Sequence, residues 1–89
     1  MPTRNLDIVN EKGLHARASA KFVETVERFD ARATVRRDGL EAAGDSIMGL
    51  LMLAAARGTS IEVETGGTDA APLLDALQEL VADRFGEGM

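Results

Sequence analysis

Three short segments of the 89-residue chain alternate polar and apolar side chains, so that each has one apolar face and one polar face. They are residues 4–9, 31–37 and 60–65, and their apolar faces carry Leu6 and Ile8, Ala33 and Val35, and Ile61 and Val63. Because successive side chains of a strand point to opposite faces, this alternation predicts half-buried strands. Half-buried strands are typical of antiparallel sheets with one face on a core. The pattern therefore predicts a mostly antiparallel sheet with helices stacked on one side.

A two-residue turn joins the second of these strands to a fourth. Asp38 and Gly39 are a strong hairpin signal, because glycine accepts the positive φ that a type I′ turn requires. The return strand is predicted over residues 40–43. The order then becomes strand, helix, strand, strand, helix, strand, helix, and residues 86–89 are expected to fray.

The helices are predicted from apolar residues at helical spacing. The first spans residues 16–28, and its stripe consists of Ala16, Ala20, Val23 and Val26, widened by Phe22 and Phe29. The second begins after Ser46, a favoured N-cap, and Gly58 is expected to close it. The third begins at Asp69 with Pro72 in its first turn. Its stripe consists of Leu73, Leu74, Leu77, Leu80 and Val81.

Length and composition indicate one soluble domain. A chain of 89 residues has room for a single core, so we expect one domain over residues 1–89. The absence of cysteine excludes disulfides, thiol nucleophiles and zinc sites built on cysteine. No segment has the apolar length of a signal peptide or a membrane span. We therefore expect a cytoplasmic protein that does not insert into membranes.

Charge is distributed unevenly along the chain. The net charge of −5 at pH 7 disfavours general binding to nucleic acid. Residues 1–37 nevertheless hold eight Lys and Arg against five Asp and Glu, whereas residues 38–89 hold two against ten. The first half could form a basic patch for an anion, or the two halves could be differently charged faces of one surface.

The polar residues exclude several kinds of site. His15 is the only histidine, so a metal site with two histidines is impossible, and no metal or bound cofactor is expected. The chain has no G-x-S-x-G elbow, no Walker A loop and no G-x-G-x-x-G motif. Three Phe without Tyr or Trp are a poor platform for stacking RNA bases.

His15 is the candidate reactive residue. It follows Gly13 and Leu14 and lies where the first predicted helix begins, and a helix start favours a bound anion. A neutral imidazole is a competent nucleophile, and the guanidinium of Arg17 could bind phosphate oxygens. These residues could therefore carry a phosphoryl group on histidine. They could equally be a surface histidine beside an unrelated arginine.

Two segments bear a family resemblance. Residues 13–23 read GLHARASAKFV, and residues 44–59 read GDSIMGLLMLAAARGT. They resemble the two signatures of HPr, the histidine-containing phosphocarrier family of the bacterial phosphoenolpyruvate-dependent sugar phosphotransferase system. The likeness in element order extends from Leu6 to about Arg84.

The resemblance implies an α+β fold, an open-faced β-sandwich of four antiparallel strands with three helices on one face (βαββαβα). It implies that His15 receives a phosphoryl group on Nδ1 from enzyme I and passes it to an A component of a permease or a regulatory counterpart. Arg17 would contact the phosphate. Such a protein is a carrier between enzymes and not an enzyme itself, and we expect a monomer.

The chain departs from the family pattern at three positions. Ala18 stands where many members have proline, and because alanine is an excellent helix former, the helix should still start there. Gly49 and Glu24 stand where many members have lysine. These two departures concern the choice of partner more than the chemistry.

Ser46 and its neighbours have two interpretations each. Ser46 is a plain N-cap, and the resemblance adds regulatory phosphorylation by a dedicated kinase, reversed by a phosphorylase. Ile47, Met48 and Leu51 would belong to the core by spacing. Leu50, Leu53 and Ala54 could instead supply the core face, which would leave Ile47, Met48 and Leu51 as an exposed apolar patch. The family resemblance places partner contacts there, and we assign Ala20 of the first helix to the same surface.

We therefore interpret the chain as a phosphocarrier with His15 as its phosphorylated residue. One alternative within the family is a nitrogen-related or purely regulatory carrier, whose acceptors control metabolism and move no sugar. An alternative of another class is a small-molecule-sensing α+β regulatory domain, which needs no reactive histidine.

Overall fold

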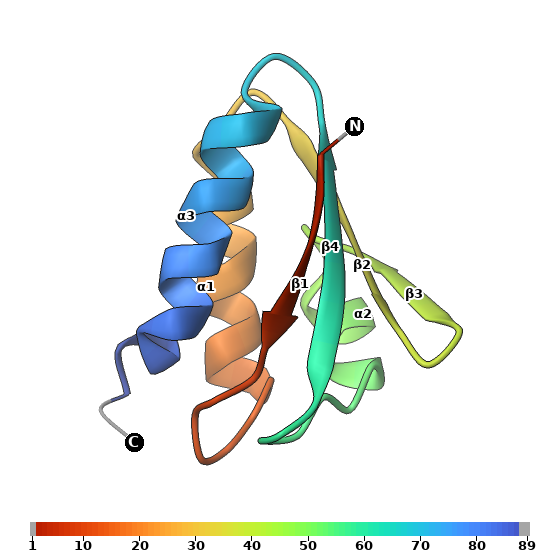
Figure 1. Ribbon diagram of the computed structural model, residues 1–89, viewed down its shortest axis with the longest axis vertical. Coiled ribbons are helices and arrows are strands. Elements are labelled where there is room, and N and C mark those ends of the chain that lie inside the picture. Colours follow the sequence, from red (N-terminus) through yellow and green to blue (C-terminus); the bar gives the residue numbers. More distant parts are fainter. Residues whose placement is uncertain (1, 88–89) are drawn as a thin grey trace.

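A computed structural model describes residues 2–87 (Figure 1). Four strands form one sheet in the order β1-β4-β2-β3, and every neighbouring pair is antiparallel. The strands are β1 (Thr3–Asp7), β2 (Arg32–Arg37), β3 (Leu40–Ala43) and β4 (Ser60–Gly66). The helices are α1 (Ala16–Glu27), α2 (Ile47–Met52) and α3 (Ala70–Ala82), and a 3-10 turn, η1 (Arg84–Gly86), follows. The predicted open-faced βαββαβα fold is confirmed.

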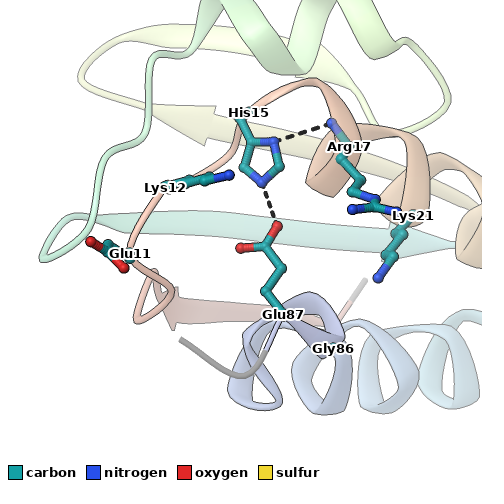
Figure 2. A pocket seen from close by; sticks show the side chains of 7 residues that line it. All are labelled: Glu11, Lys12, His15, Arg17, Lys21, Gly86 and Glu87. Atoms are coloured by element: carbon teal, nitrogen blue, oxygen red, sulfur yellow. Dashed lines mark hydrogen bonds and ion pairs between the residues drawn. The ribbon is translucent and has the colours of Figure 1, made fainter.

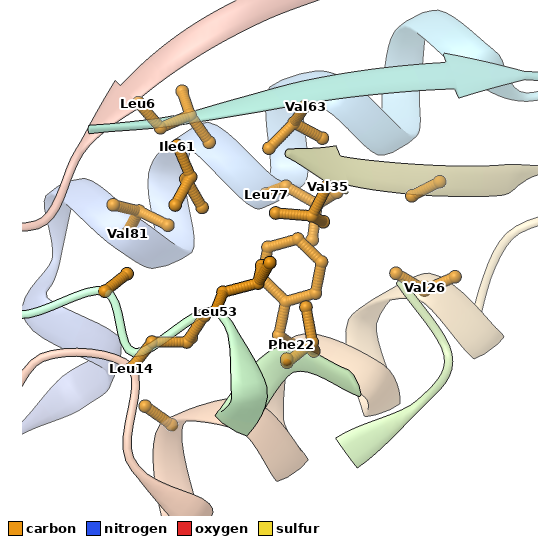
Figure 3. Packing of buried hydrophobic residues seen from close by; sticks show 14 of the residues in the cluster. Leu6, Leu14, Phe22, Val26, Val35, Leu53, Ile61, Val63, Leu77 and Val81 are labelled. Atoms are coloured by element: carbon orange, nitrogen blue, oxygen red, sulfur yellow. The ribbon is translucent and has the colours of Figure 1, made fainter. Parts of the chain in front are cut away.

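The core lies between one face of the sheet and the helices (Figure 3). Leu6 of β1 pairs with Ile61 of β4, and Val35 of β2 pairs with Val63, so the predicted inward residues share one face. Phe22 of α1 is fully buried against this face. The strand alternation therefore predicted the core correctly.

The other face of the sheet is polar. Arg36 of β2 lies among three carboxylates, and its guanidinium contacts Glu41, Glu62 and Glu64 at 2.8 to 3.2 Å. The hydrogen bonds that Arg36 donates, to Glu64 first and then to Glu41 and Glu62, raise the pKa of its guanidinium. These acidic side chains cover the sheet on the face away from the helices.

The predicted turn and the start of the first helix are confirmed. Asp38 and Gly39 have φ values of 50° and 80°, as a type I′ hairpin requires. Helix α1 begins at Ala16, and Ala18 is fully buried in its first turn. Proline is therefore not needed to start this helix.

Three local expectations are wrong. Ala16 is exposed, because it lies about 200° around the helix from the buried Ala18. Gly58 does not close α2, which ends at Met52; Ala54 takes the left-handed conformation there with a φ of 51°. Ala54 is exposed, and Ala55 is the residue that joins the core. A left-handed alanine costs about 1–2 kcal/mol of backbone strain. Alanine can therefore end a helix in this conformation where packing of the neighbouring residues offsets that cost.

The end of the chain also differs from expectation. Phe85 is fully buried, and Glu87 is held by side chains far away in the sequence, so the prediction of fraying is wrong for Gly86 and Glu87. Residues 88 and 89 lie outside the described residues. Burial of the Phe85 ring provides the free energy that orders this segment.

Asp69 begins α3 as expected, but its side chain caps no N–H of that helix. Its Oδ2 instead accepts a hydrogen bond of 2.9 Å from the backbone N–H of Asp30, which follows α1. The side chain thus joins the end of one helix to the start of another. No described helix is long and apolar enough to cross a membrane.

Candidate functional site

His15 is the N-cap residue of α1, at the end of a tightly held loop. Asn10 is fully buried and donates from Nδ2 to the carbonyl of Gly13 at 2.8 Å. Gly13 has a φ of 66°, and a Cβ there would lie 2.5 Å from the carbonyl oxygen of Ala55. Leu14 is buried and donates its N–H to that oxygen at 2.8 Å. With Leu14 fixed inward, the next side chain, His15, points outward.

The two ring nitrogens of His15 have different partners (Figure 2). Nδ1 accepts the backbone N–H of Arg17 at 3.3 Å, and Nε2 contacts the carboxylate of Glu87. A carboxylate can only accept, so Nε2 carries the proton and Nδ1 keeps its lone pair. The imidazole side chain is 27% exposed, which leaves the ring open to a partner. The geometry therefore presents Nδ1 as the nucleophilic atom.

A cavity of about 310 Å³ opens beside the imidazole. Its lining residues are Glu11, Lys12, His15, Arg17, Lys21, Gly86 and Glu87. Three of them are cations, supplied by the loop before α1 and by α1 itself (Figure 2). Within residues 2–87, neither Arg17 nor Lys12 forms an ion pair, so both are available to an anion.

Lys21 has a structural contact at the same place. Its Nζ donates to the carbonyl oxygen of Phe85 at 2.5 Å and so holds the segment after α3 against α1. Carbonyls at the end of a helical turn are unpaired acceptors, and a lysine satisfies one here. Lys21 therefore both lines the cavity and joins its two walls.

Glu87 remains ionised at this site. Burial by itself would raise the pKa of its carboxyl group, whose side chain is 14% exposed. Hydrogen bonds from Asn10 and His15, together with the charge of Lys12, outweigh that effect and lower the pKa below its usual value. A carboxylate thus faces Nε2 at neutral pH.

The sequence prediction found two of these residues and missed the others. His15 and Arg17 are brought together as predicted. Asn10, Lys21 and Glu87 were not singled out, and Glu87 gave no local signal because it is 72 residues from His15 in the chain. No cluster of three or more metal-ligating side chains occurs among the residues that the structure describes.

Ser46 is the N-cap of α2, as predicted. Its Oγ accepts the backbone N–H of Gly49 at 3.0 Å, and its backbone is extended. The side chain is half-buried. Ser46 therefore has a structural role that is independent of any modification.

An apolar patch runs along one side of α2. Leu50 and Leu53 face the core, whereas Ile47 and Met48 are 40% and 69% exposed. Leu51 and Ala20 are half-buried. Met52, which the sequence prediction did not include, is 75% exposed. We name Ile47, Met48, Leu51 and Met52 the α2 patch.

The α2 patch continues toward the histidine. A shallow depression of about 290 Å³ is lined by both His15 and Leu51, together with Lys12, Leu14, Ala54, Ala55 and Ala56. A single partner surface could therefore cover the His15 ring and the apolar patch at once.

Known proteins share this sequence and this fold. The family model of the PTS HPr component phosphorylation site matches residues 2–83. The phosphocarrier protein HPr of Neisseria meningitidis is 48% identical over 88 residues, which cover 99% of both chains, and that of Cupriavidus necator is 44% identical with the same coverage. The solved structure of HPr-C-His from Thermoanaerobacter tengcongensis matches with a TM-score of 0.94 at 32% identity, covering 100% of both chains. The structure of HPr from Bacillus anthracis matches with a TM-score of 0.85 at 35% identity, covering 90% of this chain and 95% of that one. By sequence and by fold, the chain belongs to the HPr family of phosphocarrier proteins of the phosphotransferase system.

Proposed function

We propose that the protein relays a phosphoryl group from enzyme I to an A component of the phosphotransferase system through Nδ1 of His15. The observation that carries this proposal is the asymmetry of the ring, with a lone pair on Nδ1 and a proton on Nε2 held by Glu87. His15 lies within residues 2–83, which the family model of the HPr phosphorylation site matches. Family membership leaves the alternative of a small-molecule sensor without support.

The transfer step needs no proton movement at the attacking atom. The lone pair of Nδ1 forms a bond to phosphorus, while the bond from phosphorus to the donor group on enzyme I breaks and its electron pair stays with the donor. In the second transfer, the acceptor forms a bond to phosphorus while the bond between phosphorus and Nδ1 breaks, and its electron pair returns to Nδ1. The N–H of Arg17, 3.3 Å from Nδ1, is within reach of an oxygen on a phosphorus bound there.

The guanidinium of Arg17 supplies the charge for the transferred group. It lines the same cavity as His15 and has no ion pair within residues 2–87. Guanidinium binds phosphate oxygens with planar, charge-assisted hydrogen bonds. Arg17 therefore stabilises the phosphoryl group in transfer, and His15 is the nucleophile.

The α2 patch with Ala20 is the docking surface for both partners in this proposal. Its exposed methionines adapt to different surfaces, which suits a carrier that docks in turn on a donor and on acceptors. Ser46 borders this patch, and phosphorylation by a serine kinase would add charge where a partner must exclude water. Regulation by Ser46 would thus act on docking and not on the chemistry.

Incubation with enzyme I and labelled phosphoenolpyruvate tests the relay. The protein should acquire one acid-labile label, because phosphohistidine is acid-labile and phosphoserine is not. Absence of label on the folded protein would overturn the proposal. Uptake of sugar by a deletion strain then distinguishes a transport carrier from a regulatory one.

A further inference from the structure

The two methionines of α2 are the most exposed large apolar side chains among the described residues. Met48 is 69% exposed and Met52 is 75% exposed. They lie four residues apart in the helix, so their thioethers are on the same side of it. Both sulfur atoms are therefore accessible to a dissolved oxidant.

The sulfur atoms of the described residues all belong to the α2 patch. The chain has no cysteine and four methionines, of which Met1 and Met89 lie outside the described residues. The buried core contains no methionine. Cysteine and methionine are the side chains that peroxides oxidise reversibly. Within residues 2–87, such an oxidant therefore modifies the α2 patch and leaves the packing of the core intact.

The position of α2 in the fold does not depend on its methionines. Leu50 and Leu53 are buried and anchor the helix to the core. Arg37 donates from Nη1 to the carbonyl oxygen of Leu53 at 3.0 Å, which holds the end of the helix against the hairpin of β2 and β3. Oxidation of either methionine thus alters the surface of α2 and not its place in the fold.

We propose that Met48 and Met52 form a reversible oxidation site, at which a hydroperoxide converts both thioethers to sulfoxides and so weakens docking of the carrier on its partners. The effect on docking rests on the proposed function, in which the α2 patch is the docking surface. The modification itself depends only on the exposure of the two sulfur atoms.

The reaction is a two-electron oxidation of each sulfur. A lone pair of Sδ attacks the terminal oxygen of the hydroperoxide, the O–O bond breaks, and the terminal proton passes to the departing oxygen. The thioether gains one oxygen, and the hydroperoxide is reduced to an alcohol, or to water where the oxidant is hydrogen peroxide. A methionine sulfoxide reductase reverses the change, releasing the oxygen as water while thiols are oxidised to a disulfide.

The sulfoxides would change the surface that a partner covers. A thioether is apolar and adapts to different surfaces, whereas a sulfoxide is polar and holds water. A docking partner would have to remove that water without a matched donor. The α2 patch continues into the depression lined by Leu51 and His15, so the loss falls on partners that reach the histidine. The imidazole is unchanged, so the transfer step itself should be unaffected.

The test is titration calorimetry against enzyme I before and after treatment of the protein with hydrogen peroxide. Peptide mass spectrometry measures the oxygen gained at each methionine, and circular dichroism checks the fold. Sulfoxide should form at Met48 and Met52 in the folded protein. Affinity should then fall about ten- to a hundredfold, because two apolar groups become costly to desolvate. In transfer kinetics KM should rise with kcat unchanged, and a methionine sulfoxide reductase should restore the affinity.

The double variant Met48→Leu, Met52→Leu is the matched control. It keeps apolar side chains of similar size on α2 and retains Met1 and Met89, but it lacks the two thioethers. It should bind enzyme I like wild type, both before and after treatment with peroxide. The single variants Met48→Leu and Met52→Leu replace it if the double variant does not fold, and each should lose part of the sensitivity.

Three results would overturn the inference. One is unchanged affinity of folded wild-type protein that carries both sulfoxides, and another is the absence of sulfoxide at both positions. The third is an equal loss of affinity in the leucine variants, which would assign the effect to Met1 or Met89. If untreated wild-type protein does not bind enzyme I, the proposed function fails and the effect on docking fails with it. The mass spectra still decide in that case whether Met48 and Met52 are the oxidation site.

Discussion

Two helix starts in this molecule are capped by side chains, and they differ in how the cap is made. At α2, Oγ of Ser46 accepts the N–H of Gly49 at 3.0 Å, as a serine cap is expected to do. At α1, Nδ1 of His15 accepts the N–H of Arg17 at 3.3 Å, and its other nitrogen contacts Glu87. The first cap closes a helix with a short bond, whereas the second uses a longer bond and a ring that remains partly exposed.

The two caps are suited to different roles: the Ser46 cap to stability of its helix, and the His15 cap to the proposed reaction. The hydroxyl of Ser46 is committed to the backbone of its own helix, so its removal should affect folding first. The imidazole of His15 accepts only a long hydrogen bond from its own helix, through Nδ1. Its orientation depends on the contact between Nε2 and Glu87, which follows η1. A reactive lone pair must be released easily, and a long hydrogen bond allows that.

Removal of the histidine at the start of α1 should have the largest effect. His15→Ala should abolish labelling by enzyme I and phosphoenolpyruvate while the fold survives, because no other histidine can accept the group. The measurement is incorporation of label, with circular dichroism as the fold control. Glu79→Gln, on the exposed side of α3, should label like wild type. Undiminished labelling of His15→Ala would place the acceptor elsewhere.

Arg17 tests whether the cations of the cavity act on the phosphoryl group. Arg17→Ala keeps the backbone N–H that caps Nδ1 and removes only the guanidinium. Losing a charge-assisted contact costs about 1.5–3 kcal/mol, so transfer should slow about ten- to a hundredfold without stopping. Rapid-quench transfer kinetics measure the rate. A rate equal to wild type would show that the guanidinium does not contact the transferred group.

Ser46→Asp tests the effect of charge at the second helix start. The new carboxylate would border the exposed Ile47 and Met48, with Asp45 adjacent, and a docking partner would have to desolvate it. One such contact is worth about 1–3 kcal/mol, so affinity for enzyme I should fall about five- to 150-fold. Titration calorimetry measures the affinity. Unchanged affinity in a folded variant would place the docking surface away from Ser46.

The smallest effect concerns the serine cap alone. Ser46→Ala removes the acceptor for the N–H of Gly49 and should lower the free energy of unfolding by about 1 kcal/mol. Ser60→Ala is the matched control, because Ser60 is exposed and its hydroxyl only contacts Asp7; its effect should stay within about 0.5 kcal/mol. Urea denaturation measures both. Equal stability of Ser46→Ala and wild type would mean that the cap contributes nothing to folding.

Much of this protein could be predicted from short stretches of its sequence. Strand alternation identified Leu6, Ile61 and Val63 as core residues, and Asp38-Gly39 identified the hairpin. These features depend on periodicity and on turn conformations within a few residues, so the information is local. The pairing of His15 with Arg17 is local in the same sense, since two positions separate them on one helix start.

The remaining features depended on the tertiary structure. Asn10 and Glu87 meet across 77 positions of sequence, and Glu87 reaches His15 only because Phe85 is buried and turns the chain back. The end of α2 also depends on tertiary packing, because the left-handed residue there is Ala54 and not the expected Gly58. No short pattern encodes such contacts, because the free energy that holds them comes from packing of distant elements and not from the residues' own preferences. Local patterns thus predicted the sheet and the candidate histidine, whereas packing of distant elements places Glu87 beside that histidine.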